Sequence, residues 1–223
     1  MTTKTKRKLG FIAGFSLFFT ALWLLWDTPA IYPLKIFVVM LHEISHGLVA
    51  VSTGGSIERI VLDPYQGGAC YCPGGNAFLT LSAGYLGSLL WGVGLVSAAQ
   101  SPRISNRFLV AGVGLVVLLL TALYVRNGFG LLFGLGFGAT LFAAGRRLGP
   151  GANRMILTAL GLTSCLYAIL DIKSDILDRP HLESDAAMLG DLTSTPTLLW
   201  GVLWIAVALA VVVLAFRRAY RDA

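Results

Sequence analysis

Long apolar blocks separated by short polar connections run along the whole chain. A transmembrane helix needs roughly 20 mostly apolar residues to cross about 30 Å of hydrocarbon. About seven blocks approach that length, at residues 9–26, 33–51, 77–99, 108–125, 129–144, 155–170 and 197–216. The fifth and sixth blocks are short. The pattern therefore predicts an all-α membrane protein, a bundle of about six to seven transmembrane helices.

The first block follows a cluster of four basic residues between positions 4 and 8, as the apolar part of a signal peptide would. No small-residue cleavage site follows it, and Trp23 and Trp26 close the block as interfacial aromatic residues do. We therefore interpret it as a retained span. No soluble segment is evident, so residues 1–223 are expected to form a single membrane domain.

Composition supports this interpretation. Of the 223 residues, 56% are hydrophobic and only 13% are charged, whereas a soluble domain carries about 25% charged residues. The net charge of +6 comes from basic residues at span ends, in short connections and in the tail, where membrane proteins place them. We therefore expect the lipid bilayer, and not nucleic acid, as the chain's surroundings. The cell membrane is the expected location.

Two polar stretches interrupt the apolar pattern. The first, residues 52–76, is rich in glycine; within it, residues 57–62 are typical of a short strand and residues 64–68 of a turn. Cys70 and Cys72 lie there too, spaced too closely for a usual zinc ribbon. The second stretch, residues 171–196, holds most of the remaining acids.

Small residues recur at helical spacing in two of the blocks. Gly130, Gly134 and Gly138 follow one another every four residues in the fifth block, and Gly10 and Gly14 do so in the first. Such faces let helices approach closely in lipid. These glycines therefore predict helix-packing contacts and no catalytic role.

The second block contains the sequence His42-Glu43-Ile44-Ser45-His46. A spacing of four places both imidazoles on one helix face, one turn apart, so that both can bind one metal ion. Glu43 lies beside them, where it can accept a proton from a water at that metal. We therefore expect His42 and His46 as zinc ligands and Glu43 as the catalytic base.

The location of the motif adds to its specificity. Ionisable groups within the hydrocarbon region are costly and usually functional. The chain has only three histidines, and two of them fall in this one block with a glutamate between them. The alternative is a polar cluster that only forms hydrogen bonds with neighbouring helices.

A catalytic zinc site usually has three protein ligands and one open position. Ser52 stands where a metzincin would have its third histidine, which excludes that class. His181, Glu58 and Glu183 are possible ligands, but they lie in polar stretches that read as loops.

Asp171 is the preferred third ligand and Asp175 the alternative. Both follow the sixth block and, four residues apart, would share one face of a continuing helix. The second and sixth spans cross the membrane in the same direction, so the late half of each lies toward the same side. A solvated helix end remains the competing interpretation for Asp171, and it is favoured for Asp175 and Asp185 taken singly.

With these segments the chain resembles the site-2 protease group of intramembrane zinc metalloproteases, and more closely its small relatives without a PDZ domain. The segments that carry the resemblance cover about half the chain: residues 42–47, Gly54-Gly55, Gly67-Gly68, residues 82–87, 171–175 and 184–186. Where well-studied members have Ala-Gly-Pro followed by asparagine, this chain has Ala83-Gly84-Tyr85 followed by Ser88. Their later aspartate stands in Leu-Asp-Gly, here Leu170-Asp171-Ile172.

The resemblance implies zinc held by two histidines of one span and an aspartate of a later one. It also implies a re-entrant β-hairpin-like segment after the second helix, which pairs with an extended substrate. Residues 57–62 are the segment that we assign to this pairing. A helical peptide bond is shielded within its own hydrogen bonds, so strand addition would stabilise an unwound substrate.

The leading hypothesis is therefore a zinc metalloendopeptidase that cleaves membrane-embedded protein segments. One alternative is a membrane metal transporter or sensor that uses the same residues as a transient ion site. A transport path should offer several ligand stations, and the other blocks contain almost none. A second alternative is a pseudoprotease that binds membrane partners without cutting them.

Overall fold

The computed structural model describes residues 3–26, 28–178 and 183–222. Within them the chain forms helices, one π-helical turn (η1) and one β-hairpin. In chain order these are α1 (Thr3–Leu24), α2 (Tyr32–Ser52), β1 (Arg59–Leu62), β2 (Gly68–Tyr71), α3 (Ala77–Gln100), α4 (Asn106–Tyr124), α5 (Gly128–Arg147), α6 (Pro150–Lys173), η1 (Ser174–Asp178), α7 (Asp185–Thr193) and α8 (Thr197–Asp222).

Six of these helices are long and apolar enough to cross a membrane, namely α2, α3, α4, α5, α6 with its extension, and α8. A shorter apolar segment, Lys8–Leu24, lies in α1. The predicted all-α membrane bundle of six to seven spans is thereby confirmed, as is the short hairpin after the second span.

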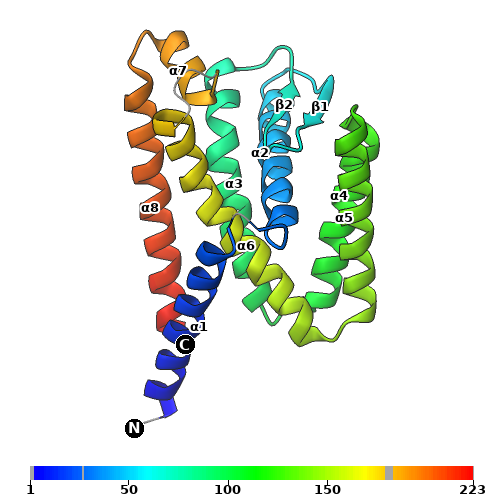
Figure 1. Ribbon diagram of the computed structural model, residues 1–223, viewed down its shortest axis with the longest axis vertical. Coiled ribbons are helices and arrows are strands. Elements are labelled where there is room, and N and C mark those ends of the chain that lie inside the picture. The colour runs from blue at the N-terminus through cyan, green and yellow to red at the C-terminus, as the bar shows by residue number, and fades with distance from the viewer. Residues whose placement is uncertain (1–2, 27, 179–182, 223) are drawn as a thin grey trace.

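Helix α2 occupies the centre of the bundle. It packs against α3 and α6 and carries the hairpin along its length, while α4 and α5 form a separate pair beside the hairpin (Figure 1). In its most apolar window, 72% of the residues of α2 are buried, against 17% for α8. The high burial of α2 agrees with its place inside the bundle, whereas α8 turns most of its apolar surface outward, toward lipid.

The first turns of several elements follow known helix-start chemistry. Pro33 and Pro150 stand at the start of α2 and α6, where a missing N–H costs nothing. The side chain of Asn76 caps α3 by accepting from the Leu79 amide, and Ser184 caps α7 by accepting from the Ala187 amide. The last of these caps fixes the start of α7 at Asp185.

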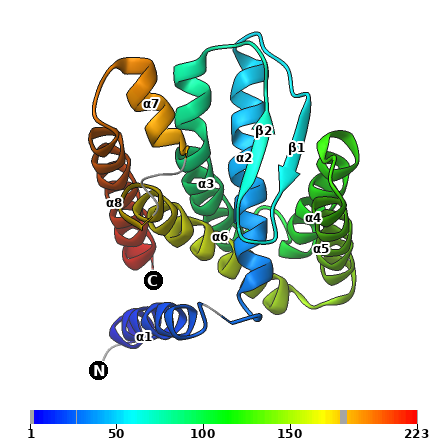
Figure 2. The same ribbon diagram turned by 45° about the horizontal axis from the view of Figure 1, so that its top comes forward.

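The hairpin doubles back along α2 (Figure 2). Its strands are antiparallel, with Ile60 opposite Cys70 and Leu62 opposite Gly68. At the turn, the hydroxyl of Tyr32 donates to the carbonyl oxygen of Pro64 at 2.7 Å. Because the hairpin starts beyond the last residue of α2 and its turn is bonded to the side chain of the first, the hairpin folds back along α2 and is re-entrant.

The glycine pattern of the fifth block packs as expected. In α5, an added Cβ on Gly134 would collide with Thr121 of α4, and one on Gly138 would lie 3.0 Å from the carbonyl oxygen of Gly114. The expectation fails for Gly10 and Gly14, since a Cβ there would meet nothing within 4 Å. The α1 helix makes few contacts with the bundle, so its small residues have no close neighbour.

Replacing Gly114 by alanine should destabilise the α4–α5 pair. The new Cβ would lie 2.5 Å from the backbone nitrogen of Phe142 and 2.7 Å from the carbonyl oxygen of Gly138. Backbone atoms cannot move aside easily, so we expect a loss of about 1–3 kcal/mol, measured by denaturation in detergent. Gly112→Ala is the matched control, because nothing lies within 4 Å of its Cβ. Equal stability of both variants would contradict this account of the packing.

Candidate metal centre

Three potential metal ligands converge where α2 meets α7. The Nε2 atoms of His42 and His46 lie 2.9 Å and 3.2 Å from Oδ2 of Asp185. The ligand atoms of these three residues all lie within 4.8 Å of one another. The histidines come from one face of α2, as their spacing requires, and Asp185 is the first residue of α7.

The donor set fits a zinc ion. Two imidazole nitrogens and a carboxylate oxygen are ordinary zinc ligands, with bonds of about 2.0–2.2 Å. Neighbouring ligand atoms around a tetrahedral ion are then about 3.3 Å apart. The observed separations of 2.9 Å and 3.2 Å are close to that value, so an ion would need only small side-chain movements.

The charge of Asp185 suits the same role. Burial acts to raise the pKa of its carboxyl, but the adjacent His46 and His42 together outweigh burial and bring the pKa below its usual range. The carboxylate is therefore ionised at neutral pH, which is the state that binds a metal.

Each histidine is restrained at its other nitrogen. Nδ1 of His46 donates to the carbonyl oxygen of Thr80 in α3 at 2.7 Å, so Nε2 is the ring nitrogen that can bind a metal when the imidazole is neutral. Nδ1 of His42 lies 3.7 Å from Oδ2 of Asp171, within ion-pair range but longer than a hydrogen bond. Such partners fix the orientation of a metal-binding imidazole.

Helix α3 approaches the histidines at a glycine. A Cβ on Gly84 would lie 2.6 Å from Nε2 of His46 and would collide with the His42 ring. One turn further, Gly87 lies directly against the Ser45 side chain. The absence of a side chain at Gly84 therefore leaves room for the two imidazoles against α3.

Glu43 is buried, and its carboxylate faces the hairpin. A Cβ on Gly68 of β2 would lie 2.7 Å from Oε1 of Glu43 and 3.0 Å from its Cδ. Glu43, His42, His46 and Asp185 all line one cavity of about 960 Å³. Strand β2 forms one wall of this cavity, and the start of α7 forms part of another.

The two strands differ in what covers their outer edges. Ile60 of β1 bridges to Val125, and the Arg126 amide donates to the Ile60 carbonyl oxygen at 3.0 Å. The side-chain amide of Asn127 also donates to the Leu62 carbonyl oxygen at 2.7 Å. Among the described residues, β1 is the only strand that pairs with β2. On the other edge of β2 the Cys70 amide donates to the Glu43 carboxylate, and the rest of that edge lines the cavity. A disulfide joins Cys70 and Cys72 at the end of β2.

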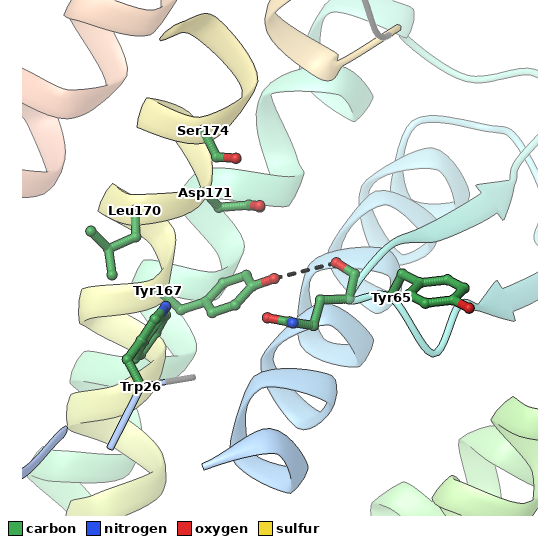
Figure 3. Close-up of a pocket in the computed structure, with 7 residues that line it drawn as sticks. Trp26, Tyr65, Tyr167, Leu170, Asp171 and Ser174 are labelled. Carbon is green, nitrogen blue, oxygen red and sulfur yellow. Dashed lines mark hydrogen bonds between the residues drawn. The ribbon is translucent and has the colours of Figure 1, made fainter. Parts of the chain in front are cut away.

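A second cavity of about 230 Å³ lies at the hairpin turn (Figure 3). Aromatic residues Trp26, Tyr65 and Tyr167 line it, and the Tyr167 hydroxyl contacts the carbonyl oxygen of Gln66. Gln66 and Asp171 line both cavities, so the two adjoin at these residues.

The carboxylate that the structure groups with the two histidines is that of Asp185, whereas the sequence favoured Asp171. Asp171 lies close to His42, as the direction of the spans predicted, but at Nδ1. Asp175 accepts a hydrogen bond from the Tyr85 hydroxyl at 2.7 Å. The regular helix ends at Lys173 and a π-helical turn follows, so the two acids do not continue one α-helical face. The set of described residues within reach of one ion includes Asp185 and neither of these.

The remaining candidates are placed as follows. Glu58 is exposed and pairs with Arg59 at 2.8 Å, away from the histidines. Glu183 is exposed at the rim of the large cavity. His181 lies outside the described residues. One sequence signal points to Asp185: it directly follows Ser184, and serine is a favoured N-cap residue. A helix that starts there turns the chain back toward the bundle.

Comparison with known proteins identifies the family. A family model described as Peptidase M50B-like matches residues 15–215, nearly the whole chain. A search of curated proteins and a search of solved structures found no match. With its six membrane-length helices and this match over most of its length, the chain is an integral multi-pass membrane protein that belongs to the Peptidase M50B-like family.

Proposed function

We propose that this chain is a zinc-dependent intramembrane endopeptidase, which hydrolyses peptide bonds in or near membrane-embedded protein segments. One observation carries the proposal. Two imidazoles and a carboxylate converge beside Glu43, in a cavity that the open edge of a β-strand also lines. Membership of a peptidase family supports hydrolysis as the reaction.

His42, His46 and Asp185 would hold the zinc ion and leave a further position for water or substrate. When bound there, zinc supplies a Lewis acid and lowers the pKa of water to about 7. Asp171 would orient His42, whose Nδ1 it approaches, and the Thr80 carbonyl oxygen would orient His46.

Glu43 would move the proton. It follows His42 directly on α2, and its carboxylate lies in the same cavity against Gly68. From there it can take a proton from the attacking water and pass it to the leaving nitrogen of the cleaved peptide bond.

Strand β2 would bind the substrate. A peptide bond inside a helix is shielded, so a membrane segment must unwind before water can attack it. An extended segment gains backbone hydrogen bonds by adding to a strand edge. Our sequence-based assignment of this role to residues 57–62 falls on β1, whose edge the α4–α5 connection covers. The edge at the cavity belongs to β2.

The transport alternative receives less support. Within residues 3–26, 28–178 and 183–222, only one group of side chains is placed to hold a metal ion. A path across the membrane would need several. The cleavage experiment below distinguishes a pseudoprotease from an active protease.

Zinc content of purified variants tests the ligand set. Wild-type protein should contain stoichiometric zinc, and Asp185→Ala should lose it, because a carboxylate bound to the ion is removed. Asp171→Ala should still bind zinc, with affinity about 10-fold weaker, because it removes only a partner of a ligand. Asp191→Ala, at an exposed position of α7, is the control. Loss of zinc in Asp171→Ala with full retention in Asp185→Ala would restore Asp171 as the ligand.

Glu43→Gln should abolish cleavage without removing zinc. The amide keeps the shape of the side chain but cannot accept a proton, and losing a general base costs about 100-fold or more. Cleavage of membrane-segment peptides in proteoliposomes measures the effect. Glu58→Gln, an exposed acid before β1, serves as the control. Undiminished cleavage by Glu43→Gln would refute the mechanism, and a zinc-loaded wild type that cleaves no segment would favour the pseudoprotease.

Gly68→Ala should impair cleavage while leaving zinc in place. Its new Cβ would lie within 3.0 Å of the Glu43 carboxylate and displace it, and a shift of about 1 Å can cost about 100-fold in rate. The neighbouring variant Gly67→Ala is a matched control, since its nearest contact is an ordinary 3.6 Å to Asp63. Comparable rates for the two variants would show that the position of Glu43 against β2 does not matter.

A further inference from the structure

Tyr85 lies at the junction between the helix that carries the histidines and the segments that carry the aspartates. We propose that Tyr85 and Asp175 form a positioning pair, which holds the His42 ring in its metal-binding orientation. The inference rests on the metal centre proposed above and assigns a role in it to two residues that do not bind the ion. The resulting restraint on His42 differs from the one that holds His46.

The ring of Tyr85 packs against the ring of His42. Their centroids are 5.3 Å apart and the planes are inclined at 81°, an edge-to-face arrangement. Such a contact favours one orientation of the imidazole over others. Tyr85 is only 1% exposed and is not among the residues that line the cavity, so it would act on the metal centre through the residues that it packs against.

The hydroxyl of Tyr85 has a specific partner. It donates to Oδ2 of Asp175 at 2.7 Å, across the space between α3 and η1. A buried tyrosine hydroxyl normally needs such a partner, and a hydrogen bond to a carboxylate is among the stronger ones. The bond therefore fixes the phenol ring, and the fixed ring in turn limits the movement of the imidazole.

The π-helical turn η1 places Asp171 and Asp175 against different partners. Asp171 precedes the turn and lies beside Nδ1 of His42. Asp175 lies within the turn and meets the Tyr85 hydroxyl instead. Single π-helical turns are frequent at functional sites. Here the turn lets one segment restrain the imidazole both directly and through a second ring.

Tyr85 also contacts the segment that carries the third ligand. It belongs to a buried cluster with Ile172 of α6, Ala186 and Leu189 of α7, and Trp204 of α8. Ala186 directly follows Asp185, so the same side chain that packs on His42 also supports the start of α7. By comparison, His46 is held by the Thr80 carbonyl oxygen, a backbone group that no substitution removes.

The test compares Tyr85→Phe, Asp175→Ala, Asp175→Asn and the double variant Tyr85→Phe/Asp175→Ala in purified protein. Tyr124→Phe, in α4, removes a hydroxyl outside the metal centre and is the control. Chelator competition gives the zinc dissociation constant, and the visible absorption of the Co²⁺-substituted protein reports ligand geometry. Thermal unfolding of the metal-free protein separates positioning from general stability.

Tyr85→Phe should weaken zinc binding about 10-fold and shift the Co²⁺ bands, with metal-free unfolding unchanged. Asp175→Ala should weaken zinc binding to the same extent. The double variant should bind zinc as tightly as either single variant, because all three lose the same hydrogen bond. Asp175→Asn keeps an acceptor for the hydroxyl and should stay close to wild type.

Two results would overturn this inference and leave the proposed function intact. One is a wild-type dissociation constant and spectrum in Tyr85→Phe. The other is a loss of zinc affinity that follows a matching loss of metal-free stability, which would make the pair a general packing contact. A wild-type protein that binds no zinc would instead overturn the proposed function, and the inference with it.

Discussion

The close approach of α3 to α2 is the constraint on which the candidate site depends. Gly84 and Gly87 allow it, since a side chain at either position would strike His42, His46 or Ser45. At this distance the Thr80 carbonyl reaches one imidazole and the Tyr85 ring reaches the other. Association of helices in lipid relies on close packing and small residues, because lipid tails are as apolar as the helices. The same packing therefore assembles the bundle and orients the ligands.

Polar groups within the bundle are arranged around this contact. A buried polar group without a partner is costly, and a buried charge more so. The imidazoles face the Asp185 carboxylate, and the Tyr85 hydroxyl faces Asp175. The Trp91 indole donates to the Ser45 hydroxyl, which donates in turn to the Leu41 carbonyl oxygen. These side chains thus find their polar partners inside the bundle.

Much of this could be predicted from sequence, and the limits have a physical reason. Hydrophobic length identifies spans, and spacing of four places His42 and His46 together, because both are local properties of a helix. Glycines and turn residues likewise located the hairpin. Sequence favours Asp171 over Asp185, because the position of Asp185 beside the histidines depends on the chain returning after α6, which no local spacing encodes. The same holds for the strand edges: only the tertiary contact of Asn127 with Leu62 reveals that β1 is covered.

The covered edge of β1 has a consequence for specificity. An open strand edge on a protein surface invites pairing with any other strand, including that of a second copy. In this hairpin, one edge is closed by the α4–α5 connection and the other is recessed in a cavity between helices. The fold thereby limits edge-to-edge pairing, and under the proposed function it would make the ease of unwinding a property on which substrates are selected.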